Sequence, residues 1–102
     1  MIEKLKKIIQ EHKDLSDQLT DPQIVNDIKL YQKISQQYSN LKDKAEIAQN
    51  YLNKLDELEG IQNIIDNETD SEIKELAVEE LDNLNSELAN LEKSINKILV
   101  EA

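Results

Sequence analysis

The sequence has no cysteine, phenylalanine or tryptophan, and it has only one glycine and one proline. Without cysteine the chain has neither a disulfide framework nor thiolate chemistry, which suits a reducing compartment. A single glycine excludes a glycine-rich phosphate-binding loop. So few turn-forming and aromatic residues are unusual for a compact globule. The abundance of Leu, Ile, Lys, Glu, Asp, Gln and Asn instead favours long helices packed along a narrow seam.

Long apolar runs are also lacking. No stretch reaches the ~20 apolar residues that a membrane-spanning helix needs. The start of the chain, MIEKLKKIIQEHK, has no continuous apolar core of signal-peptide length. We therefore expect a cytoplasmic location and no membrane partner.

Basic residues are scarce relative to acidic ones, with 12 against 22, which gives a formal net charge of -10. Phosphate binding needs Lys and Arg to displace counterions, so we expect no direct, sequence-specific nucleic-acid binding. An anionic membrane surface is disfavoured for the same reason. The acidic balance serves either plain solubility or a basic protein partner.

Apolar residues recur at helical intervals in three segments. The first stripe predicts an amphipathic helix of about five turns over residues 2–19. In the connector 20–27, Asp21 can cap a new helical turn, and the only proline can take its first position, where a missing N–H costs nothing. Asn26 or Asp27 offers a second cap.

A heptad seam predicts a second helix over residues 28–65, about 38 residues and 57 Å long. Gly60 lies inside it and is about 1 kcal/mol less favourable there than alanine. Tyr31 and Tyr38 stand near the connector, where we expect their rings to fill the junction between helices. The predicted core positions of the seam are Tyr31, Ile34, Tyr38, Leu41, Ala45, Ala48, Leu52 and Leu55.

The turn 66–70 interrupts the pattern, and a third helix is predicted over 71–100. Thr69 with Glu72 three residues later forms a capping-box pattern, and Asp70 is the rival cap. A short turn makes the two flanking helices antiparallel neighbours. We therefore predict an all-α fold, an elongated antiparallel three-helix bundle or coiled-coil hairpin, as one domain over the whole chain. The core positions of the third helix are Ala77, Leu81, Leu84, Leu88, Leu91, Ile95 and Ile98.

Residues suited to catalysis or metal binding are nearly absent. The single histidine, His12, has no partner at metal-ligand spacing and is interpreted as a half-exposed helix residue. Asp66, Glu68 and Asp70 imitate the start of a calcium loop, but the sixth position is Ser71 rather than glycine, and the twelfth lacks the bidentate Glu. We predict no catalytic residue, no cofactor and no metal site.

Two stretches carry a resemblance to a known family. The first is LTDPQIVNDIKLYQKISQQYSNL, and the second is DSEIKELAVEELDNL, an acidic turn followed by a helix start. Together they resemble the amino-terminal domain of bacterial peptide chain release factor one, over essentially the whole chain. The residues that carry the match are Asp21, Pro22, Ile34, Ser35, Tyr38, Leu41, Glu72, Ile73, Glu75, Leu76, Ala77, Glu79, Glu80 and Leu81.

The resemblance implies a role in translation termination, the stop-codon-dependent hydrolysis of peptidyl-tRNA on the ribosome. Family members read UAA and UAG and promote hydrolysis through a Gly-Gly-Gln loop. A chain with one glycine has no such loop, so this chain is expected not to be an enzyme by itself. The family's first domain is helical and reaches toward the stalk base of the large subunit, so the implied partner is the ribosome, at a protein-rich patch.

Contacts with such a partner are expected at the acidic turns, since the seam residues belong to the core. The candidates are Asp66, Glu68, Asp70, Glu72, Asp21 and Asp27. Acidic turns that only solubilise the chain are an equal alternative.

Two other classes of protein stay open. One is a free-standing coiled-coil adaptor or scaffold, for which the seam permits self-association. The other is the tRNA-binding arm of a synthetase, which needs a basic face. A Gly-Gly-Gln loop further along the parent gene favours the release factor, and a stop codon near residue 102 favours the adaptor.

Overall fold

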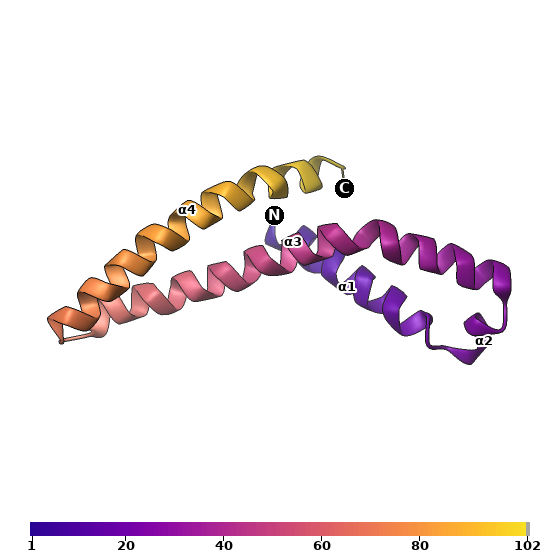
Figure 1. Ribbon diagram of the computed structural model, residues 1–102, viewed down its shortest axis with the longest axis horizontal. Helices are drawn as coiled ribbons and strands as arrows, with labels where there is room; N and C mark the ends of the chain where they lie inside the picture. The colour runs from indigo at the N-terminus through magenta and orange to yellow at the C-terminus, as the bar shows by residue number, and fades with distance from the viewer. Residues whose placement is uncertain (102) are drawn as a thin grey trace. The chain divides into compact units, whose positions relative to one another are not determined.

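The computed structural model describes residues 1–101, which form four helices: α1 (Ile2–Gln18), α2 (Pro22–Val25), α3 (Ile28–Asn67) and α4 (Ser71–Glu101). Figure 1 shows their order along the chain. The described part of the chain contains no strand, and the predicted all-α class is confirmed. The chain divides into two compact units. Unit 1 is Met1–Gln49, unit 2 begins at Asn50, and α3 contributes its first half to one and its second half to the other.

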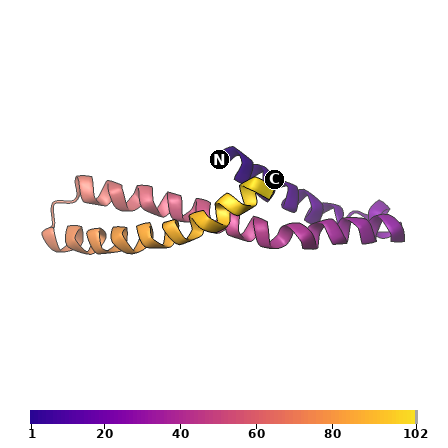
Figure 2. The same cartoon turned by 90° about the horizontal axis from the view of Figure 1, so that it is seen from above.

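Unit 1 pairs α1 with the first half of α3, and the two run antiparallel (Figures 1 and 2). Tyr38 lies on the predicted seam and stacks on His12 of α1, with ring centroids 4.5 Å apart. The buried apolar side chains of the unit are Leu5, Ile8, Ile34, Ala45 and Ala48. The two alanines are the small residues of the predicted seam, which permit close approach of a neighbouring backbone or a large side chain.

Tyr31 departs from the prediction that its ring fills a junction, because 38% of its surface is exposed. The reason is the length of α1. Counting equal steps along both helices from the stacked His12 and Tyr38, Tyr31 lies level with Leu19, one residue beyond the end of α1. No turn of α1 covers it there.

Unit 2 is a hairpin in which the second half of α3 runs antiparallel to α4 (Figure 1). Its buried side chains on α4 include Leu84 and Leu88, as their heptad phase predicts. The full buried set of the unit is Tyr51, Ala77, Leu84, Leu88, Ile95 and Ile98.

Tyr51 is a core residue that the heptad assignment misses. It is 3% exposed, whereas the predicted seam residues Leu52 and Leu55 are only half-buried. The partner of α3 changes at this point of the chain. Its first half belongs to unit 1 with α1, whereas Tyr51 belongs to unit 2, in which α3 pairs with α4. The seam assigned along the first half therefore does not fix which residue of the second half is buried.

Gly60 does not interrupt α3, which continues through it to Asn67. The residue is exposed, and a Cβ added there would meet nothing within 4 Å. Its cost is therefore the intrinsic helix propensity of glycine alone.

None of the helices among residues 1–101 is long and apolar enough to cross a membrane.

Candidate interaction sites at the acidic turns

The connector between α1 and α3 places its two acidic residues as helix caps. Asp21 precedes α2, and its carboxylate accepts a hydrogen bond from the Gln23 backbone N–H at 3.0 Å. Pro22 follows as the first helical residue. Asp27 precedes α3, and its Oδ1 accepts from the Leu30 N–H at 3.2 Å. Both carboxylates satisfy backbone donors that a helix start leaves unpaired, and both complement the positive end of the helix dipole.

The turn between α3 and α4 uses acidic side chains in the same way. The Glu68 carboxylate accepts from the backbone N–H groups of Thr69 at 3.1 Å and Asp70 at 3.0 Å. The Asp70 carboxylate accepts from Glu72 N–H at 2.9 Å and Ile73 N–H at 3.4 Å. Asp70 is therefore the cap of α4.

The prediction that Thr69 and Glu72 form a capping box is wrong. Thr69 donates its backbone N–H to Glu68, and the rival cap Asp70 occupies the position immediately before Ser71, the first residue of α4. A carboxylate is as good a cap as a hydroxyl and adds a favourable charge at the helix start. Fixing the Thr69 and Asp70 N–H groups on Glu68 also shapes the turn without a glycine.

The six candidate residues thus fall into two groups. Four carboxylates, those of Asp21, Asp27, Glu68 and Asp70, accept backbone hydrogen bonds. Asp66 and Glu72 are exposed, and their carboxylates are not among these caps; Glu72 contributes only its backbone N–H to the Asp70 cap. Helix capping and turn hydrogen bonds explain why the first four positions hold acidic residues. Their charges are still available at the protein surface. The connector residues belong to unit 1 and the 66–72 residues belong to unit 2, so each group is described by itself.

His12 is held by packing. Its ring lies nearly parallel to that of Tyr38, at 14°, and its Nε2 is shielded from solvent without a hydrogen-bond partner. Within residues 1–101, no three His, Asp or Glu side chains gather in a way that could hold a metal ion. The histidine therefore contributes an aromatic contact to unit 1.

A hollow of about 540 Å³ lies between α1 and α3 in unit 1. Its floor includes Leu15 and Leu41, and its walls are mixed in charge. The lining residues are Glu11, Asp14, Leu15, Gln18, Gln37, Asn40, Leu41 and Lys44. The lining contains no hydroxyl, thiol or imidazole, and its ionisable groups are Glu11, Asp14 and Lys44.

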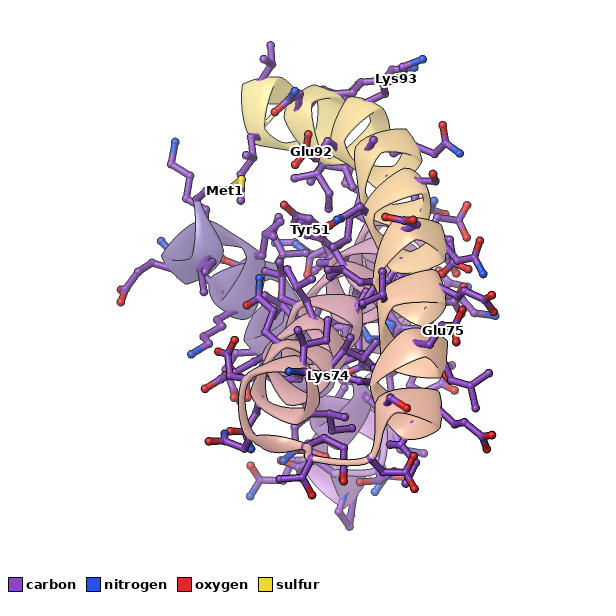
Figure 3. All side chains as sticks on the ribbon, turned by 90° about the vertical axis from the view of Figure 1, so that its left-hand side faces the viewer. Met1, Tyr51, Lys74, Glu75, Glu92 and Lys93 are labelled. Atoms are coloured by element: carbon purple, nitrogen blue, oxygen red, sulfur yellow. The ribbon has the colours of Figure 1, made fainter. Side chains whose placement is uncertain are left out.

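Two polar contacts between the helices of the unit 2 hairpin were not predicted from the sequence. The Tyr51 hydroxyl of α3 hydrogen-bonds to the Glu92 carboxylate of α4; both residues are labelled in Figure 3. Burial raises the pKa of Tyr51 above its ordinary value, and the negative charge of Glu92 and their hydrogen bond raise it further. The phenol is therefore held in its neutral form.

Lys54 of α3 pairs with Glu87 of α4. The hydrogen bond to Glu87 is the main cause that raises the pKa of Lys54, with the charges of Glu87 and Glu57 adding to it and partial burial opposing it. Lys54 lies 13 residues before the end of α3 and Glu87 lies 16 residues after the start of α4, a difference of less than one helical turn. An ion-pair search along the predicted antiparallel hairpin would therefore have found them.

The chain matches the model of the PCRF domain over residues 8–102. Among curated relatives, a protein named Peptide chain release factor 1 from Bacteroides thetaiotaomicron is 34% identical over 102 residues, which is 100% of this chain and 28% of the relative. Its namesake from Lactobacillus acidophilus is 48% identical over 96 residues, 94% of this chain and 26% of the relative.

A third relative of the same name, from Clostridioides difficile, is 32% identical over 100 residues. No solved structure matches the chain. The chain spans little more than a quarter of the length of these relatives. The matches confirm the predicted resemblance to bacterial peptide chain release factor one, and the chain belongs to the PCRF-domain family.

Proposed function

We propose that this chain is the amino-terminal, all-helical part of a translation termination factor and acts as its interaction arm. The observation that carries the proposal is the match of nearly the entire chain to relatives named Peptide chain release factor 1. In this account the arm contributes to ribosome binding, and hydrolysis of peptidyl-tRNA belongs to other parts of the parent protein. The Gly-Gly-Gln loop of that chemistry is absent from this sequence.

The arm docks on protein, at a protein-rich patch of the stalk base, through its acidic turns. Its net charge of -10 makes approach to bare RNA repulsive within about a Debye length, ~8 Å at physiological salt. A basic ribosomal protein attracts the same surface, and this attraction increases the rate of association. Asp66 and Glu72 are exposed, and the Glu68 and Asp70 charges remain in the turn while their oxygens cap the backbone. The connector residues Asp21 and Asp27 are secondary candidates on the same argument.

A ribosome release assay separates the arm from the catalytic function. Purified chain is added to ribosomes carrying peptidyl-tRNA and a UAA or UAG codon in the decoding site. We expect no release above the blank without factor, because this sequence has a single glycine and therefore no Gly-Gly-Gln loop. Codon-dependent release by this chain alone would contradict the assignment of the arm role.

A further inference from the structure

A groove runs along one side of the unit 2 hairpin, between α3 and α4. It has a volume of about 200 Å³. Ile61 of α3 and Leu84 of α4 give it an apolar floor, and three glutamates and an asparagine form its rim. The rim residues are Glu57, Glu80, Asn83 and Glu87.

Exposed apolar side chains extend this groove toward the turn. Ile64 is 42% exposed and lies one helical turn beyond Ile61 on α3. Leu76 is 60% exposed and lies one turn before Glu80 on α4, and Ile73, 45% exposed, lies one turn before Leu76. Residues three or four apart share a face of a helix, so these side chains continue the groove lines of their helices. From Ile73 to Glu87 the α4 side of the groove is about 21 Å long, the length of a helix of roughly four turns.

The charge of the groove rim is negative. Glu57 and Glu80 carry it, whereas Glu87 is paired with Lys54. A second copy of this chain would bring its own net charge of -10, and a nucleic acid would bring phosphates. Both are repelled. A partner that buries Ile64 and Leu76 while placing Lys or Arg against the rim satisfies both features of the groove.

We propose that this groove binds an amphipathic, positively charged helix of a partner protein. The apolar face of that helix covers Ile61, Ile64 and Leu76, and its basic residues pair with Glu57 and Glu80. The groove extends toward the turn but uses other residues than the turn carboxylates, and its test involves no ribosome. The proposal therefore stands or falls independently of the release-factor assignment.

The test uses the complete 102-residue chain and a fluorescein-labelled, 18-residue synthetic peptide with leucine and lysine at helical spacing. Binding is measured by fluorescence anisotropy. Relative to the unaltered chain, Glu57→Gln with Glu80→Gln is expected to weaken binding roughly two- to thirtyfold, because two surface ion pairs are lost. Leu76→Ala is expected to weaken binding at least roughly fivefold, because its exposed side chain provides buried apolar contact.

The matched control is Glu59→Gln with Glu75→Gln, which makes the same change in charge with one residue on each helix. Glu59 lies two residues after Glu57 and therefore points to the opposite side of α3. Figure 3 shows Glu75 on the outer side of α4. This pair is expected to change the affinity less than twofold. Circular dichroism verifies that every variant keeps the helix content of the unaltered chain.

The outcomes separate the possible occupants. Selective weakening by the groove pair supports the proposal. Equal weakening by both pairs means diffuse charge attraction and overturns it. Equal binding of a peptide with glutamate in place of lysine, absence of peptide binding, or a dimer in sedimentation velocity that Leu76→Ala abolishes would each overturn it as well.

Discussion

Individual carboxylates cap helices and fix a turn in a chain that is poor in glycine and proline. Asp21, Asp27 and Asp70 each cap a helix, and Glu68 holds the two N–H groups between α3 and α4. Each cap typically contributes about 1 kcal/mol. The acidic excess is therefore partly a consequence of how the helices start. Among the aromatic residues, Tyr51 combines burial with a hydrogen bond to Glu92.

Tyr51→Phe is expected to lower the free energy of unfolding at pH 7 by ~0.5–1.5 kcal/mol, because the hydrogen bond from Tyr51 to Glu92 is lost. The folded-state pKa of Tyr51 is raised, so its neutral form is favoured by folding. That contribution is complete below the ordinary pKa near 10 and is lost as the pH rises through the higher folded value. The unaltered chain should therefore lose more stability than the variant above pH 10. Urea unfolding followed by circular dichroism at pH 7 and 11 measures this, and identical pH dependence in both proteins would count against the Tyr51–Glu92 interaction.

Among the elements, the heptad period predicts where helices lie more reliably than which residue each helix buries. Leu84 and Leu88 are buried as their phase requires, but Tyr51 replaces Leu52 in the core, because α3 passes from unit 1 to unit 2 just before Tyr51. The prediction that Tyr31 fills a junction was wrong because α1 ends at Gln18, before the level of the Tyr31 ring. The turn before α4 was predicted. Its cap was not, because residue spacing alone does not distinguish Thr69 from Asp70 as the capping residue.

The candidate sites were predictable in part. Sequence reasoning found the acidic residues of both turns and proposed Asp21 as one cap and Asn26 or Asp27 as a second. It did not find that the Glu68 carboxylate accepts hydrogen bonds from two backbone N–H groups, because these bonds depend on the backbone conformation of the turn. The groove beside Ile61 also escaped it, since a groove depends on which flanks of two helices face the same side.

Leu84→Ala is expected to lower the free energy of unfolding by ~2–5 kcal/mol, because Leu84 is 4% exposed and its removal leaves a cavity. This is a large share of the roughly 5–15 kcal/mol that stabilises a typical domain. Leu76→Ala on the same helix is the control, since Leu76 is 60% exposed and its loss should cost within about 0.5 kcal/mol. Thermal melts report both changes. Equal midpoints for the two variants would show that the assigned hairpin core is wrong.

At the scale of the whole molecule, the chain combines buried apolar seams with an acidic surface. Family membership assigns it to the PCRF domain, and its net charge of -10 favours a basic protein surface over RNA as its docking partner. The central claim is that the turn carboxylates speed this docking. Neutralising them with amides is a clean test, because Asn and Gln keep an oxygen that can accept the capping hydrogen bonds.

The most direct measurement is the association rate of a full-length release factor carrying this chain with ribosomes, by stopped flow at low and high salt. One variant changes Asp66 and Asp70 to Asn and Glu68 and Glu72 to Gln. Its control makes the same four kinds of change at exposed residues elsewhere, namely Asp43, Asp56, Glu3 and Glu46. The account predicts that the turn variant associates more slowly than the control and the unaltered factor, with a difference that shrinks at high salt. Equal rates for all three factors at low salt would contradict it.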